Sequence, residues 1–88
     1  MYAVVATDFV IGKDPKMETI YAEDEAAVRQ AVVDLHLSRF RDTSLAGDHF
    51  LRICNENKED KDLLIEKLYV FFRSTRSESY TVDFKAVP

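Results

Sequence analysis

Residues 24–40, DEAAVRQAVVDLHLSRF, decide the fold, because they predict one amphipathic helix with two apolar faces. Asp24 is suited to cap this helix, since its carboxylate can accept hydrogen bonds from the free N–H groups of the first turn. The acidic residues on both sides of Asp24 favour the positive end of the helix dipole. We expect the helix to run from residue 25 to residue 40 or 41.

The apolar residues of this helix form two stripes on nearly opposite faces. One stripe has the i, i+3, i+4, i+7 spacing of a helix that packs on a sheet, and it consists of Val28, Ala31, Val32 and Leu35. The other stripe consists of Ala26, Val33, Leu37 and Phe40. A sheet covers only one stripe, so another helix, a loop or another chain must cover the second.

The residues before the helix predict a β-hairpin. Residues 2–11 are rich in β-branched and aromatic side chains, and residues 17–22 alternate between two faces, as strands do. Gly12 and Pro15 lie between them and favour a turn. Asp8 is the one carboxylate surrounded by mostly apolar sequence, and we expect it to face outward or to mark a bend in its strand.

Two further elements follow the helix. Residues 49–55 alternate in polarity and predict a third strand, with Phe50 and Cys54 on the face opposite Ile53. Residues 58–74 predict a second helix that Asn57 caps. The apolar stripe of that helix consists of Leu64, Ile65, Leu68, Phe71 and Phe72, and two apolar residues lie outside it, Leu63 and Val70.

Residues 80–87 show the clearest alternation in the chain, and they predict the last strand. The residues expected to face the core are Tyr80, Val82, Phe84 and Ala86. The predicted order of elements is therefore β-β-α-β-α-β. Two helices on one face of a four-stranded, mostly antiparallel or mixed sheet make a two-layer α+β sandwich. A length of 88 residues suits a single domain that spans residues 1–88.

Composition and charge restrict the class of protein. Twelve basic residues against sixteen acidic ones give a net charge of −4, the opposite of the balance in proteins that neutralise nucleic-acid phosphates. A single cysteine cannot form an internal disulfide, which favours a reducing compartment. The opening residues lack the pattern of a signal peptide, and no apolar run approaches the roughly 20 residues of a membrane span. We expect a cytoplasmic protein with no membrane segment.

Few residues of this chain could carry catalysis or hold a cofactor. His36 and His49 are the only histidines, and their spacing to Cys54 matches no metal-binding motif. Two scattered glycines cannot build a phosphate-binding loop. Cys54 with either histidine is the only dyad that the chain offers, and we expect Cys54 to be a buried, small apolar residue. The sequence thus predicts a protein that is not an enzyme and has no cofactor.

We expect a small non-catalytic protein-interaction module, a regulator or inhibitor of a larger assembly of the kind that phages and mobile elements encode. The reason is the apolar helix surface beyond what one sheet face covers, because large exposed apolar patches mark interaction sites. Formation of a homodimer is the simplest way to cover it. The predicted interface consists of Ala26, Val33, Leu37, Phe40, Leu63 and Val70.

The alternative is a nucleic-acid-associated protein that uses an arginine patch. Arginines lie near the ends of both predicted helices and in the predicted third strand, so they would form a patch if these elements converge. The patch would consist of Arg39, Arg41, Arg52, Arg73 and Arg76. Outward aromatic residues on the sheet would support it, but the last strand is expected to turn Tyr80 and Phe84 inward. We therefore expect a protein partner rather than a nucleic acid.

Overall fold

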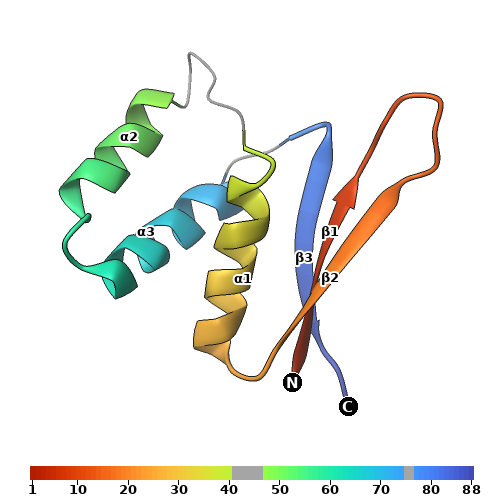
Figure 1. Ribbon diagram of the computed structural model, residues 1–88, viewed down its shortest axis with the longest axis horizontal. Helices are drawn as coiled ribbons and strands as arrows, with labels where there is room; N and C mark the ends of the chain where they lie inside the picture. Colours follow the sequence, from red (N-terminus) through yellow and green to blue (C-terminus); the bar gives the residue numbers. More distant parts are fainter. Residues whose placement is uncertain (41–46, 75–76) are drawn as a thin grey trace.

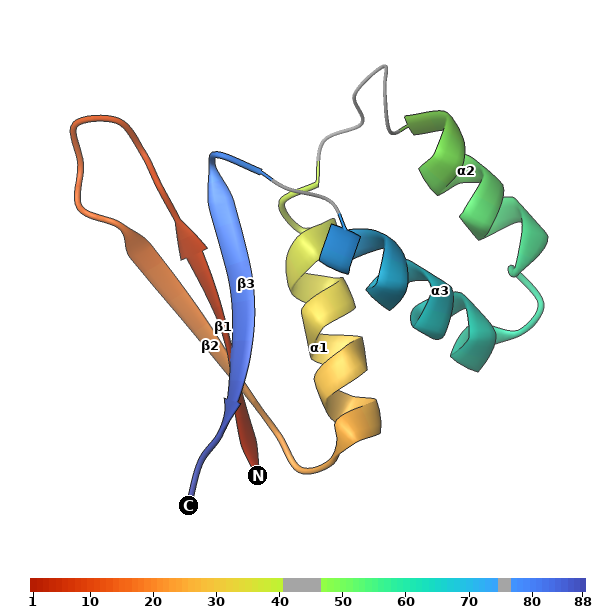
Figure 2. The same ribbon diagram turned by 180° about the vertical axis from the view of Figure 1, so that it is seen from behind.

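The computed structural model is an α+β fold whose elements stack in three layers. It describes residues 1–40, 47–74 and 77–88. Figures 1 and 2 show a sheet, one helix that lies along it, and a pair of helices on the far side of that helix. The principal extents are 38 × 34 × 16 Å, so the molecule is a thin slab.

The sheet has three strands in the described part of the chain, and all pairing is antiparallel. β1 (Tyr2–Asp8) lies in the middle, between β2 (Lys16–Ala22) and β3 (Tyr80–Ala86). Its residues pair with both neighbours along its whole length. The predicted hairpin and the predicted last strand are confirmed. Gly12 has a φ of 79°, the left-handed conformation that favours glycine in a turn.

α1 (Glu25–Leu37) packs along one face of the sheet. The backbone N–H of Ala27 donates to the Asp24 carboxylate at 2.8 Å, which confirms the predicted cap. The predicted sheet-facing stripe is also confirmed, because its four residues share one core cluster with residues of β1 and β2, namely Val4, Ala6 and Ala22. The helix ends at Leu37, three or four residues before its predicted end.

The predicted third strand is wrong. The described residues place all of 49–55 in a helix, α2 (Gly47–Glu56), which packs on α3 (Lys61–Ser74). At helical spacing Phe50, Ile53 and Cys54 lie at i, i+3 and i+4, and all three contact the core cluster of α3. A pattern of seven residues is compatible with both the period of a strand and the period of a helix, so the packing of these residues on α3 decides for the helix. The sheet thus has three strands, and the observed order is β-β-α-α-α-β.

α3 begins at Lys61, three residues after the predicted start. Asp60 rather than Asn57 supplies the capping side chain, because the N–H of Leu63 donates to the Asp60 carboxylate at 3.1 Å. Asn57 donates its side-chain amide to the Ile53 carbonyl instead, at the end of α2. The predicted stripe of α3 is confirmed, since its members lie in or against one core cluster.

α3 covers part of the second apolar stripe of α1. Val33 has no exposed surface and packs with Leu68, Phe71 and Phe72. The ring of Phe40 is half-buried, 4.9 Å from the ring of Phe50. Because α3 lies behind α1 instead of beside it on the sheet, three layers replace the predicted two. None of the described helices combines the length and the apolarity that a membrane crossing requires.

Candidate interaction site

β3 forms a free edge of the sheet: within the described ranges it pairs with β1 on one side and with no strand on the other. Two backbone hydrogen bonds at the ends of the β1–β3 ladder show which residue pairs are hydrogen-bonded. The N–H of Phe9 donates to the Ser79 carbonyl at 2.8 Å, and the N–H of Val87 donates to the Met1 carbonyl at 3.0 Å. Antiparallel strands alternate between bonded and non-bonded pairs, so the odd-numbered residues of β3 bond to β1. The backbone groups that point toward the free edge are those of Tyr80, Val82, Phe84 and Ala86.

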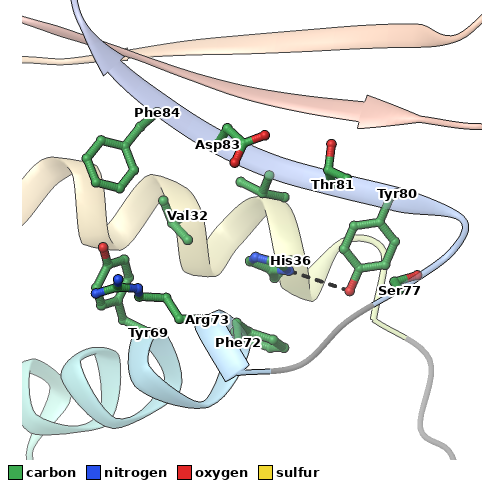
Figure 3. Close-up of a pocket in the computed structure, with 11 residues that line it drawn as sticks. Val32, His36, Tyr69, Phe72, Arg73, Ser77, Tyr80, Thr81, Asp83 and Phe84 are labelled. Atoms are coloured by element: carbon green, nitrogen blue, oxygen red, sulfur yellow. Dashed lines mark hydrogen bonds between the residues drawn. The ribbon is translucent and has the colours of Figure 1, made fainter.

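An open groove lies beside this edge (Figure 3). β3 bounds it on one side and α3 on the other, and α1 lies between them. Its main hollow has a volume of about 520 Å³. A second hollow of about 350 Å³ shares Tyr69, Arg73 and Phe84 with the first, so the two continue into each other. The groove therefore presents the free strand edge together with side chains of two helices.

Phe84 is an aromatic side chain that the helix layer leaves partly uncovered. Its ring lies on the helix-facing side of β3, like that of Tyr80 (Figure 3). Yet Phe84 is 47% exposed, whereas Tyr80 is 8% exposed. The rings of Tyr2 and Phe84 make an edge-to-face contact, with a centroid distance of 6.4 Å. The predicted core position of Phe84, and that of the exposed Ala86, is therefore wrong.

Buried aromatic rings form the floor of the groove. The ring of His36 is stacked on that of Phe72, with centroids 4.7 Å apart and planes 3° from parallel. Its Nδ1 lies 3.5 Å from the Tyr80 hydroxyl. Burial, and after it the charge of Arg39, lower the pKa of His36, and burial raises the pKa of Tyr80. The folded structure therefore favours the uncharged form of both groups.

Arg73 places a positive charge over the open side of the groove. Its guanidinium lies 5.6 Å from the centroid of the Tyr69 ring, the geometry of a cation–π contact. Asp83, on β3, lines the same hollow. The groove thus offers backbone donors and acceptors, aromatic surface and a positive charge.

The structure places the described arginines of the predicted patch in three different settings. Arg39 donates two hydrogen bonds to Asp8, at 2.8 and 3.0 Å, and one to Glu18, at 2.8 Å. These bonds raise the pKa of Arg39 and tie the end of α1 to the hairpin. Arg52 lies exposed on α2 and Arg73 lies over the groove. The other two members, Arg41 and Arg76, are outside the described residues.

The predicted interface residues fall into two groups. Val33 and Phe40 belong to the core beneath α3. The exposed members are Ala26, Leu37 at 41%, Leu63 at 38% and Val70 at 61%. None of these six residues lines the groove beside β3. The apolar stripe of a single helix could not predict this groove, because the groove lies between elements that are far apart in the sequence.

Of the three groups that the sequence offers for chemistry, Cys54 and His49 lie away from this groove, and only His36 lines it. Cys54 is half-buried on α2, and burial raises the pKa of its thiol, which disfavours the reactive thiolate. The ring of His49 packs against that of Phe71, 5.4 Å away. Across the residues with described positions, no group of three or more His, Cys, Asp and Glu side chains could hold a metal ion.

No family model, curated protein or solved structure matches this chain.

Proposed function

We propose that this chain is a non-catalytic protein-interaction module that binds an extended protein segment along the free edge of β3. The observation that carries the proposal is the continuity of this edge with the open aromatic groove. An added strand gains affinity from backbone hydrogen bonds, and its alternate side chains supply specificity in adjoining hollows. The groove beside β3 provides such hollows on the helix-facing side.

The regularity of β3 supports this mode of binding. Proteins protect free edges with proline, with bulges, with inward-pointing charges or with charged side chains such as lysine on the edge strand. Of these devices β3 has only the charged side chains, and it keeps one unbroken register with β1. Its two charged residues, Asp83 and Lys85, alternate with the helix-facing residues and therefore lie on the outer face. The free edge is a continuous template, roughly 23 Å long at about 3.3 Å per residue.

The exposed aromatic surface supports it as well. Phe84 is 47% exposed at the junction of the two hollows, close to Tyr69 and Arg73, which line both of them. Covering this ring removes apolar surface from water, and the neighbouring cation can pair with an acidic group. A module that acts by covering a surface of its partner is suited to regulate or inhibit a larger assembly.

A nucleic-acid partner has less support. The net charge is −4, and Arg39 is neutralised by two carboxylates. Arg73 is the one arginine of the predicted patch that lines the described groove. Arg29 also lines the second hollow, but Glu25 lies beside it there. Phosphate binding depends on several cations acting together, and two cations supply little of that affinity.

The proposal is tested with the tagged chain as bait in an extract of its native source. Phe84→Asp places a charge in the groove, and Leu51→Asp is the matched control, because Leu51 is 50% exposed on α2, away from β3. Circular dichroism verifies that both variants fold. We expect one protein to be captured by the wild type and by Leu51→Asp, and to be lost with Phe84→Asp. Capture that Phe84→Asp leaves unchanged would reject the groove as the binding site.

A further inference from the structure

We infer that a second copy of this chain binds at this edge, with the two β3 strands antiparallel and Phe84 opposite Phe84 of the second copy. The inference rests on the proposed function, because it uses the same edge and the same groove. It adds the identity of the partner and the register of pairing.

The backbone of β3 is compatible with this pairing. The N–H and C=O groups of Val82, Phe84 and Ala86 point toward the free edge, because the odd-numbered residues of β3 are the ones that bond to β1. A two-fold axis at Phe84 sets Phe84 against its own copy and Val82 against Ala86 of the second copy. Each pair can then exchange two backbone hydrogen bonds, and the sheets join into one of six strands, a common size.

The two charges on β3 select the register. With the axis at Phe84, Asp83 lies opposite Lys85 of the second copy, and the symmetric pair forms as well. Both pairs occupy non-hydrogen-bonded positions, where side chains across antiparallel strands are closest. An axis at Asp83 would set two carboxylates against each other, and an axis at Lys85 would set two ammonium groups together. Like charges directly opposite destabilise a sheet, and among axes on β3 only the one at Phe84 pairs Asp83 with Lys85, so this axis is favoured.

The apolar surface favours the same arrangement. The Phe84 rings, each 47% exposed, would meet at the axis, and each groove would be closed by the other copy. The other free edge, β2, offers no comparable pair of opposite charges to a second copy, because its Glu18 carboxylate already accepts a hydrogen bond from Arg39.

Charge reversal tests both the dimer and its register. Sedimentation equilibrium should show a dimer for the wild type. Asp83→Lys or Lys85→Asp alone creates two like-charge contacts, so we expect the dissociation constant to rise about tenfold or more. The double variant should restore the dimer. An equimolar mixture of the two single variants should form a heterodimer, since each Lys then meets an Asp. Both residues are exposed, so all these variants should fold.

The outcomes separate this inference from the proposed function. Single reversals that leave the dimer intact would overturn the register. A wild-type chain that stays monomeric up to its solubility limit would overturn the dimer. If Phe84→Asp nevertheless abolishes capture of another protein, the proposed function stands without the dimer. A monomer whose capture of other proteins does not depend on Phe84 would overturn both.

Discussion

Arg39 holds the end of α1 against the hairpin through charge-assisted hydrogen bonds. Its side chain is 15% exposed, and its guanidinium reaches Asp8 on β1 and Glu18 on β2. A bidentate pair with this little exposure is stronger than an exposed ion pair. Asp8 thus faces inward to a partner, whereas its sequence setting predicted an outward position or a bend.

The variant Arg39→Ala tests this contact. We expect it to lower the free energy of unfolding by about 1–3 kcal/mol, because it leaves Asp8 without its charged partner. Arg29→Ala is the matched control: its exposed pair with Glu25 is 4.0 Å long, so the loss should be under about 0.5 kcal/mol. Urea denaturation measures both values. Equal losses would contradict a special role for Arg39.

His36 makes the stability of the protein depend on pH. Its pKa is lowered in the folded state from an unfolded value near 6.5, so the unfolded chain binds more protons as the pH falls. The free energy of unfolding should therefore decrease as the pH falls from about 7.5 to about 5.5, by at most about 1.4 kcal/mol per unit.

Replacing His36 by phenylalanine keeps a ring against Phe72 and removes the titrating group. The unfolding free energy of His36→Phe should vary less with pH over this range than that of the wild type. Urea titrations at several pH values provide the comparison. Identical pH profiles for the two chains would show that His36 is not the responsible group.

Among the elements, α2 illustrates what a short pattern leaves undecided. Residues 49–55 alternate in polarity, and the same residues also place Phe50, Ile53 and Cys54 on one helical face. Contact with α3, seen only in the folded structure, decides between the two. By contrast, α1 could be predicted from its cap at Asp24 and its long apolar stripe, and β3 from seven alternating residues.

Two alanine variants distinguish a helix from a strand at α2. In a strand Leu51 and Ile53 share a face, whereas in this helix Ile53 packs on α3 and Leu51 is 50% exposed. Ile53→Ala should therefore cost about 1–3 kcal/mol of unfolding free energy, and Leu51→Ala under about 0.5 kcal/mol. Thermal or urea denaturation gives both numbers. Similar costs at the two positions would contradict the helix.

At the scale of the whole molecule, α1 is the middle layer, with its first apolar stripe on the sheet and part of its second stripe beneath α3. Val33 and Phe40 pack there, whereas Ala26 and Leu37 of the second stripe stay exposed. The candidate site arises elsewhere, where β3, α1 and α3 meet. The sequence could not predict it, because residues such as His36, Tyr69 and Phe84 are brought together only by the fold.

The acidic balance of the whole chain leads to a further expected result. Short single- and double-stranded DNA probes should show no shift with the wild-type protein at low salt, because a net charge of −4 opposes phosphate binding. An electrophoretic mobility assay tests this. A shift that weakens steeply as salt is added would instead support the arginine alternative.

Amide hydrogen exchange of the purified chain tests the central claim most directly. The amides of Val82 and Phe84 face the free edge of β3, and that of Thr19 faces the opposite edge, on β2. We predict that the β3 amides exchange slowly at high protein concentration and faster on dilution, while exchange at Thr19 does not depend on concentration. Fast exchange of Val82 and Phe84 at every concentration would contradict a paired β3 edge.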